Sequence, residues 1–330
     1  MGWGFGQTPA HILQKALQGL ALMADPSNPK HAEGIGIVQR KFVRMTDILY
    51  QKKEGDEASA RSLQLVTEIS HSTFLLDGLN QMVNFPVEQR KQFTIIFTGC
   101  LACQIGTEYP IEVWILRNQH VFNILLNFYE HPELAVHAGE MLRLCAHHAP
   151  LAKALLMPER LDRLFPFFSV PHFDVAADSF ATFRELILKS PIGVKEFIPN
   201  NIPQIIQRLH ATLDENNYAA CRQSLKLIYE IIDEIECFKR AYLGNEQNLI
   251  VMMKLMSSQY KNISIEAFNI FKLFVKCQDK TQSVKKILTA NSDKLIAFIN
   301  TLLDGNEDLQ PEKDYLIVQL GVLREGQSTS

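Results

Sequence analysis

The sequence predicts an all-α solenoid, on three observations. Apolar residues recur at the helical period along almost the whole chain, whereas the alternation typical of half-buried strands is almost absent. The 16 glycines and 14 prolines are few and stand at short joints, so helices follow one another without a long linker. Five long amphipathic segments can be superimposed on one another, which indicates an internal repeat.

Proline marks the predicted joints between helices, because it lacks a backbone N–H and restricts the residue before it. No Ser- or Gly-rich linker divides the sequence, so we expect a single repeat domain over residues 9–325. Residues 1–8 and 326–330 are expected to be flexible tails. The predicted joints are Asp25-Pro26, Phe85-Pro86, Tyr109-Pro110, His131-Pro132, Ala149-Pro150, Val170-Pro171, Ser190-Pro191 and Asn201-Ile202-Pro203.

One residue in each of five helices anchors the repeat: Phe93, Met141, Phe180, Leu225 and Phe268. Their spacing is close to the period of about 40–47 residues that is typical of armadillo and HEAT repeats. A single unit of this size cannot bury its own apolar face, so stacked neighbours must supply the core. We therefore expect a right-handed α-solenoid of about six armadillo/HEAT-like repeats, with an irregular helical bundle as the alternative.

The helix predicted over residues 218–235 has two unlike faces. Tyr218, Arg222, Lys226 and Tyr229 lie along a narrow strip, because residues four and eight positions apart share one side of a helix. In an armadillo-type stack the last helix of each repeat lines the concave surface, so this strip is expected to face a partner. The broad opposite face is apolar and is expected to be buried: Ala220, Cys221, Leu225, Leu227, Ile228, Ile231, Ile232 and Ile235.

The same register extends the strip into the neighbouring repeats. In the preceding repeat the strip positions hold Phe173 and Arg184, and in the following repeat they hold Ile265, Asn269 and Lys272. Aromatic residues and arginine are enriched at the hot spots of protein interfaces. We therefore expect one groove that binds a partner carrying acidic groups and aromatic anchors. An ordinary solvated helix face with a few charges is the alternative.

Several segments of the chain resemble signatures of the calcium-binding-protein-39 family, the mouse-protein-25-type scaffolds. The resemblance is collinear from about Pro9 to Leu323 and is strongest over the C-terminal two thirds. The segments that carry it are Phe173–Phe183, Arg222–Leu227 and Asn262–Phe268, together with Gln104–Thr107, Pro150–Lys153 and Lys280–Gln282.

This resemblance implies an armadillo-like crescent whose concave face binds a protein kinase or pseudokinase domain and favours its active conformation. It further implies a pocket near the C-terminal repeats that takes a short aromatic-acidic peptide from the partner. Germinal-centre-type kinases are among the implied partners, and cell polarity, morphogenesis and division are the implied processes. The six cysteines lie inside apolar helical runs, which indicates reduced core thiols and a cytoplasmic protein.

Carried over position by position, the resemblance assigns kinase contacts to the strip. Phe173, Tyr218, Arg222 and Lys226 match concave residues that touch the kinase domain, in agreement with the register of the repeats. Phe238 matches an aromatic residue used against the active kinase.

The tail-peptide pocket follows the family less closely. Met253 matches one of its walls. Ala290 stands where the family often has Lys, which would weaken recognition of a carboxylate tail or move it to Lys294. Ile235 stands where the family usually has Arg, and this departure puts simultaneous binding of two kinases in doubt.

The sequence favours neither a metal site nor a cofactor. Asp304-Gly305-Asn306-Glu307-Asp308 lacks the order of ligands that an EF-hand needs, so we expect no calcium. Cys100 and Cys103 have CxxC spacing without a second pair, and Cys145, His147 and His148 are too few ligands for zinc on one helix face.

Catalytic motifs are equally weak. No phosphate-binding GxxxxGK and no Gly-x-Ser-x-Gly elbow occurs in the sequence. Asp174 and Asp178 stand early in a predicted helix, where acidic residues suit the helix dipole, so we interpret them as capping residues. The sequence therefore predicts a protein that is not an enzyme.

The remaining alternative is a nuclear-import-type adaptor that binds basic cargo peptides. Such proteins carry a ladder of Trp-x-x-x-Asn motifs, but here that spacing occurs once, from Trp114 to Asn118. The net charge of −3 also argues against nucleic-acid or membrane-surface binding. No apolar run is long enough to span a membrane, and the N-terminus does not resemble a signal peptide.

Overall fold

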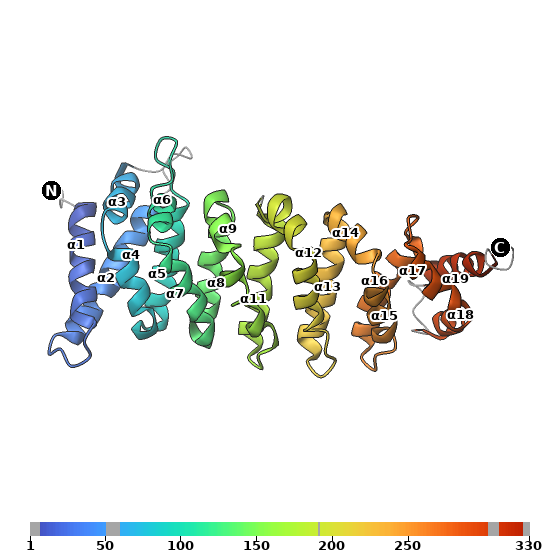
Figure 1. Cartoon of the computed structure of the whole chain (residues 1–330). Coiled ribbons are helices and arrows are strands. Elements are labelled where there is room, and N and C mark those ends of the chain that lie inside the picture. Colours follow the sequence, from blue (N-terminus) through green and yellow to red (C-terminus); the bar gives the residue numbers. More distant parts are fainter. Residues whose placement is uncertain (1–6, 51–59, 191, 303–309, 326–330) are drawn as a thin grey trace. The chain divides into compact units, whose positions relative to one another are not determined.

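A computed structural model describes residues 7–50, 60–190, 192–302 and 310–325 of the chain. These residues form helices joined by short turns (Figure 1). Within them, extended pairing is limited to a single antiparallel bridge between Ile105 and Glu108. None of the described helices is both long enough and apolar enough to cross a membrane. The prediction of an all-α, armadillo/HEAT-like solenoid is confirmed.

The chain divides into two compact units, residues 1–193 and 194–330. The expectation of one repeat domain over residues 9–325 stays a prediction. The tails expected over residues 1–8 and 326–330 lie largely outside the described residues, but Thr8 already caps the first helix by accepting a hydrogen bond from the His11 N–H.

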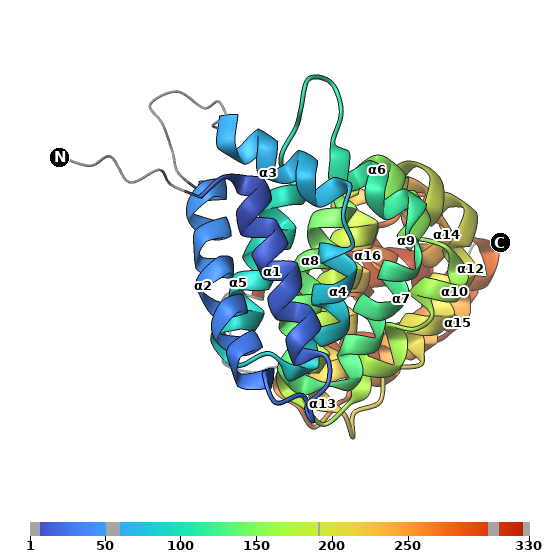
Figure 2. The ribbon, with the colours of Figure 1, turned by 90° about the vertical axis from the view of Figure 1, so that its left-hand side faces the viewer.

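The first unit contains eleven described α-helices and four short 3₁₀- or π-helical turns. Figure 2 looks onto its first pair, α1 and α2, which pack side by side. The elements are α1 (Pro9–Met23), α2 (His31–Tyr50), α3 (Ala60–Ser70), α4 (Phe74–Gln81), η1 (Met82–Asn84), α5 (Val87–Leu101), α6 (Pro110–Arg117), α7 (His120–Asn127), η2 (Phe128–Glu130), α8 (Pro132–Ala146), α9 (Ala149–Leu155), α10 (Pro158–Leu161), η3 (Phe165–Ser169), α11 (Phe173–Arg184) and η4 (Glu185–Lys189).

The second unit begins within the π-helical turn η5 (Gly193–Phe197). Its helices among the described residues are α12 (Ile198–His210), α13 (Tyr218–Glu234), α14 (Glu236–Leu243), α15 (Glu246–Leu255), α16 (Lys261–Lys276), α17 (Gln282–Ala290), α18 (Ser292–Thr301) and α19 (Gln310–Glu325).

Long helices of successive repeats pack directly on one another in each unit. In the first unit α2, α5, α8 and α11 form such a series, and in the second unit α13, α16 and α19 do. The five predicted anchors, Phe93, Met141, Phe180, Leu225 and Phe268, lie on these helices and are all buried. The helices that carry the predicted repeat anchors are therefore the helices that pack on one another in each unit.

Four of the eight predicted proline joints are helix starts, at Pro86, Pro110, Pro132 and Pro150. Pro110 and Pro132 occupy the first position of α6 and α8, where the missing N–H costs nothing. Pro86 stands immediately before α5. The joint at Asn201-Ile202-Pro203 is different, because α12 continues through it and only kinks, with Asn201 at non-helical angles.

Candidate partner-binding surface

Helix α13 divides its side chains between core and surface as its sequence predicts. The helix starts at Tyr218 because the Asn217 side chain accepts a hydrogen bond from the Ala220 N–H. The predicted apolar face is buried throughout, whereas the side chain of Arg222 is 38% exposed and that of Lys226 is 44% exposed. The strip is therefore accessible, and Tyr229 lies half-buried at its end.

Helix α16 completes the strip with polar contacts to α13. The Asn262 amide donates a hydrogen bond of 2.8 Å to the Tyr218 hydroxyl. The Glu266 carboxylate lies 3.6 Å from the Arg222 Nε and 3.9 Å from the Lys226 Nζ. The Tyr218 ring also packs on Tyr260, with ring centroids 5.4 Å apart.

These contacts bring a carboxylate into the strip that the repeat register did not include. The register placed Ile265 at the position equivalent to Arg222, and the next residue, Glu266, is the one that contacts Arg222 and Lys226. Sequence reasoning therefore missed the one carboxylate that both cations share. The only signal in the sequence was its place beside Ile265 in the same family-like segment, because a repeat register gives equivalent positions and not contacts between helices.

The strip continues from α16 to α19. The Lys272 Nζ forms an ion pair with Glu312 of α19 and also lies 5.9 Å from the centre of the Phe268 ring. The Lys276 Nζ lies 5.5 Å from the centre of the Tyr315 ring. Asn269 is half-buried on the same helix. We call the side chains of Tyr218, Arg222, Lys226, Asn262, Glu266, Asn269, Lys272 and Lys276 the α13–α16 strip.

The α13–α16 strip is less basic than its sequence suggests. It carries four cations, Arg222, Lys226, Lys272 and Lys276, of which three are in ion-pair range of Glu266 or Glu312. The pairs of Arg222 and Lys226 with Glu266 are partly exposed and stabilise the fold by roughly 0–1 kcal/mol, because water screens them, whereas the Lys272 side chain is only 12% exposed. The Glu266 pairs therefore hold Arg222 and Lys226 in place without preventing them from contacting a partner.

In the first unit, Phe173 is exposed at the start of α11. Its side chain is 69% exposed, the largest value among the exposed large apolar residues of the described chain. Arg184 is half-buried at the end of the same helix. The prediction that Phe173 and Arg184 share a groove with Tyr218 joins residues of two units and stays a prediction.

A buried polar network fixes α11 against α8. The Arg143 guanidinium donates to Asp178 Oδ1 at 2.9 Å and to Thr182 Oγ1 at 2.8 Å. The Tyr129 hydroxyl donates to Asp178 Oδ2 at 2.7 Å. Burial raises the pKa of Asp178, and the nearby Arg143 charge opposes that rise.

This network corrects the interpretation of Asp178 as a capping residue. The side chain is buried and pairs with another helix, because its position on α11 faces α8. Asp174 is in the first turn of α11 and exposed, as a residue that suits the helix dipole would be.

The assignment of Phe238 to a partner contact is wrong. Its side chain is fully buried, and its ring stacks on Tyr242 with centroids 5.8 Å apart. The adjacent Ile235 is also buried. Helix α14 packs against α12, α13 and α15, so the ring is part of the core of the second unit.

The residues carried over for the tail-peptide pocket lie on three helices. Met253 of α15 is half-buried, whereas Ala290 of α17 and Lys294 of α18 are exposed. A depression of about 420 Å³ opens nearby, between the end of α15, the start of α16 and the end of α18. Its lining includes Met256, Ser264 and Phe298, but neither Met253 nor Lys294.

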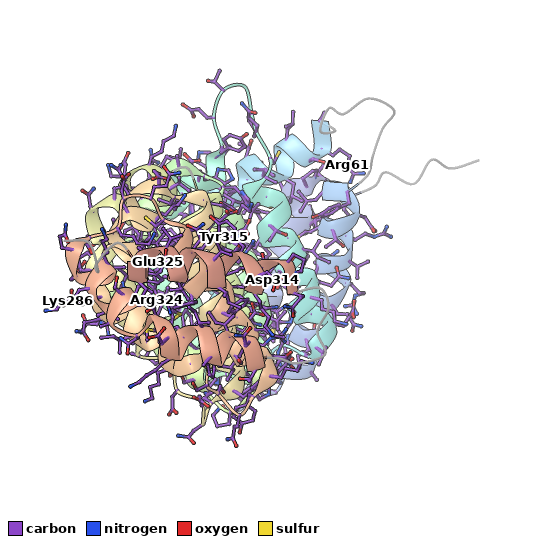
Figure 3. The ribbon with its side chains drawn as sticks, turned by 90° about the vertical axis from the view of Figure 1, so that its right-hand side faces the viewer. Arg61, Lys286, Asp314, Tyr315, Arg324 and Glu325 are labelled. Atoms are coloured by element: carbon purple, nitrogen blue, oxygen red, sulfur yellow. The ribbon has the colours of Figure 1, made fainter. Side chains whose placement is uncertain are left out.

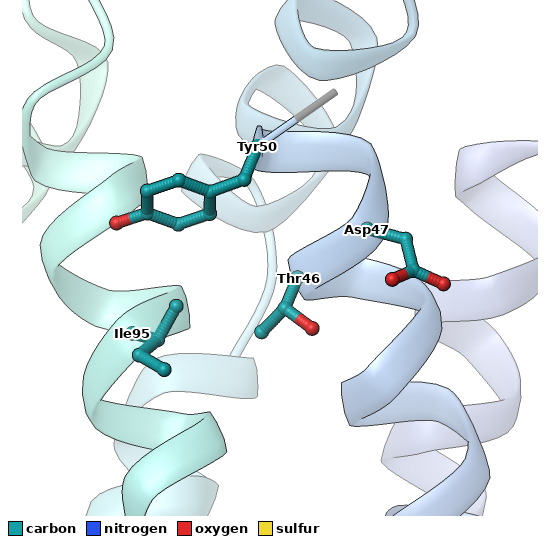
Figure 4. Close-up of a pocket in the computed structure, with 4 residues that line it drawn as sticks. All are labelled: Thr46, Asp47, Tyr50 and Ile95. Carbon is teal, nitrogen blue, oxygen red and sulfur yellow. The ribbon is translucent and has the colours of Figure 1, made fainter. Parts of the chain in front are cut away.

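The first unit has a further depression, which sequence reasoning did not predict. It lies between α2 and α5, measures about 520 Å³ and is lined by Thr46, Asp47, Tyr50 and Ile95 (Figure 4). The close-up shows the Tyr50 ring and Ile95 bordering it from the two helices.

The cysteines and histidines of the described residues are dispersed among the helices. No three His, Cys, Asp or Glu side chains gather there as a metal ion would require. Burial raises the pKa of the Cys100 and Cys145 thiols, which favours the unreactive protonated form. His147 and His148 pair with different carboxylates, Glu185 at 3.1 Å and Glu112 at 2.7 Å. The rejected EF-hand segment at Asp304–Asp308 lies outside the described residues.

Comparison with known proteins gives matches over nearly the whole chain. A family model described as Mo25-like matches residues 4–324. Calcium-binding protein 39-like of Homo sapiens is 32% identical over 323 residues, which cover 96% of this chain and 96% of the relative. MO25-like protein 2 of Caenorhabditis elegans is 29% identical over 327 residues, covering 96% and 97%. The Mo25-like protein of Schizosaccharomyces pombe is 31% identical and covers 81% of this chain and 82% of its own length.

Among solved structures, a designed armadillo repeat protein in complex with the peptide (KR)4 is similar to 78% of this chain and 98% of its own. The TM-score is 0.44 and the identity 13%, a likeness too loose to bear on function.

Proposed function

Because this chain belongs to the Mo25-like family, we propose that it is a non-catalytic scaffold that binds a protein kinase or pseudokinase domain and raises kinase activity. The observation that carries the proposal is the column of Tyr218, Arg222 and Lys226. One side of α13 is buried in the core, while this column stays accessible and is held in position by α16. Preorganised aromatic and cationic side chains of this kind are typical of interface hot spots.

The charges of the α13–α16 strip define the partner surface that fits it. Its four cations exceed the two carboxylates, Glu266 and Glu312, that lie within reach of them. Arg222 approaches Glu266 through Nε, so the terminal nitrogens of the guanidinium are outside that contact. A partner carboxylate can then accept hydrogen bonds from them. The fitting surface is therefore mainly neutral with a small acidic excess, which also disfavours basic cargo of the nuclear-import type.

Activation follows from a difference in affinity. A scaffold that binds the active conformation of a kinase more tightly than the inactive one shifts the population towards the active form. Coupling of this kind typically amounts to about 1–3 kcal/mol, or roughly 5–150-fold. No phosphotransfer chemistry by the scaffold is needed. We place this activity in the cytoplasm, in signalling that controls cell polarity, morphogenesis or division, and without a metal or cofactor.

The test is binding and activation with a panel of purified germinal-centre-type kinases and pseudokinases. Affinity is measured by interferometry and kinase activity as kcat/KM. The double variant R222A/K226A should weaken binding at least tenfold, about 1.4 kcal/mol, and remove activation without changing thermal unfolding. The matched control is K285A/K286A, which removes two exposed lysines of α17 and should behave as wild type. Undiminished binding by R222A/K226A would refute the site.

We further propose that a short aromatic-acidic peptide of the partner binds beside Met253 and Lys294. A synthetic peptide ending in Trp-Glu-Phe, titrated into the protein, should bind more weakly to K294E and more tightly to A290K, because the first change repels its carboxylates and the second adds a cation. Equal affinities for wild type, K294E and A290K would contradict this location.

A further inference from the structure

Helix α19 carries an apolar stripe on its exposed side. Tyr315 is 45% exposed, Val318 is 61% exposed and Val322 is 59% exposed. The three residues are three and four positions apart, so they fall within about 60° of one another around the helix. We call them the α19 stripe.

The opposite side of α19 is firmly held by its own unit. Leu316 and Leu320 are fully buried, and α16, α17 and α18 pack against the helix. The buried Lys313 ammonium donates to the carbonyls of Asn300 and Leu302, at 3.2 Å and 2.9 Å, and so satisfies the end of α18. The α19 stripe is therefore a preformed surface on an anchored helix.

Acidic side chains border the stripe on one side. Asp314 and Glu325 are both exposed, and their separation along the helix places them on the same flank, near its two ends. Figure 3, which looks at the C-terminal end of the molecule, labels both residues and Tyr315 on α19. On the other side Lys276 of α16 lies over the Tyr315 ring. The Glu312 carboxylate on that side is paired with Lys272, so the exposed carboxylates of α19 lie on the opposite flank.

We propose that the α19 stripe binds an amphipathic helix of another protein, with apolar residues at three- and four-residue spacing and basic residues along one flank. A helix fits because a row of exposed apolar residues at three- and four-residue spacing matches the apolar face of an amphipathic helix. The basic flank fits because Asp314 and Glu325 form a two-point acidic border. This inference is independent of the proposed kinase contact at Arg222 and Lys226.

A second copy of this chain is a poorer occupant. An antiparallel pair of copies related by a twofold axis would place both acidic flanks on the same side of the interface. Asp314 of one copy would then face Glu325 of the other. Like charges in contact oppose association. A basic-flanked helix meets no such repulsion.

The probe is a labelled synthetic peptide of about 18 residues, long enough to form a helix, with leucines at the stated spacing and lysines on one flank. A matched peptide carries glutamates in place of the lysines. Fluorescence anisotropy with the full chain should show tighter binding of the lysine peptide and weakening of that binding as salt increases.

Variants then locate the binding. V318E/V322E should weaken lysine-peptide binding at least tenfold, and V318S/V322S should do so with less risk to the fold, which circular dichroism monitors. The control V87E/V136E changes two similarly exposed valines of the first unit and should have no effect. D314K/E325K should reverse the preference and favour the glutamate peptide.

Equal binding of the two peptides, or lysine-peptide binding that survives V318S/V322S, would overturn the proposal. So would a concentration-dependent dimer in sedimentation that V318S/V322S abolishes, because the occupant would then be a second copy. R222A/K226A should leave peptide binding intact, so failure of the kinase proposal and failure of this one are distinguishable.

Discussion

Gly139 allows the two helices that hold Phe173 in place to approach each other. A Cβ atom at this position would lie 1.8 Å from Asp178 Oδ2 and 2.6 Å from the Arg143 guanidinium. Gly139→Ala should therefore displace the buried ion pair and lower the free energy of unfolding by about 3 kcal/mol. Urea denaturation measures this change. Gly321→Ala on α19, where nothing lies within 4 Å, should instead stabilise the helix by about 0.5–1 kcal/mol. Equal effects of the two changes would contradict the steric argument.

His210 should make stability depend on pH. Burial lowers the pKa of its ring from about 6.5 to about 4, and its Nε2 lies 2.9 Å from the Tyr242 hydroxyl. Between these values the unfolded chain binds a proton that the folded chain does not. The free energy of unfolding should therefore fall as pH decreases from about 6.5 to 4, by about 3 kcal/mol in full.

Urea midpoints at several pH values check this expectation. His210→Gln should flatten the acid side of the profile, whereas the same change at exposed His11 should not. An unchanged slope in His210→Gln would show that another group causes the acid sensitivity.

At the scale of elements, Phe238 shows how a residue carried over from a resemblance can belong to the core. Its ring is enclosed by α14 and its neighbours. Phe238→Ala should therefore cost about 3–5 kcal/mol of unfolding free energy, while the folded fraction should bind a kinase domain with wild-type affinity. Calorimetry and interferometry at a temperature well below unfolding separate the two effects. A loss of affinity without a loss of stability would restore the original assignment.

The helices were predictable because each carries its own local signals. Apolar periodicity placed Phe93, Leu225 and Phe268 in the core, and prolines placed the starts of α6 and α8. The prediction of a joint at Pro203 was wrong because a proline within a helix can kink the helix without ending it. Here the backbone of Asn201 leaves the helical angles and α12 continues beyond the proline. The interpretation of Asp178 as a capping residue was wrong because a rule for helix starts considers one helix only, whereas Asp178 pairs with Arg143 of α8.

At the scale of the whole molecule, the candidate site was predictable only in part. The column of Tyr218, Arg222 and Lys226 followed from one helix, since periodicity alone separates its faces. Glu266 and the neutralisation it brings depend on how α13 packs against α16, which the pattern of neither helix gives by itself. The depression at Tyr50 and the α19 stripe depend on what covers a helix, and no local pattern encodes this.

The next prediction concerns a single kinase domain that binds residues of both units. A kinase domain that contacts both should lose affinity when either surface is altered. Phe173→Ala should therefore weaken binding about tenfold, about 1.4 kcal/mol, without changing thermal unfolding, because the side chain is mostly exposed. Its control is Val87→Ala, which shortens another exposed apolar residue of the same unit.

Combining Phe173→Ala with R222A/K226A distinguishes the possible modes of binding. Independent contacts with the same rigid partner contribute nearly additively to the binding free energy, so the fold-losses in affinity should multiply. Interferometry against one kinase domain measures the dissociation constants of Phe173→Ala, R222A/K226A and the triple variant. All three proteins should be equally stable at the temperature of the measurement. Wild-type affinity in Phe173→Ala alone would confine the partner to the second unit. A triple variant no weaker than R222A/K226A would mean that the Phe173 contact forms only after the α13–α16 strip has bound.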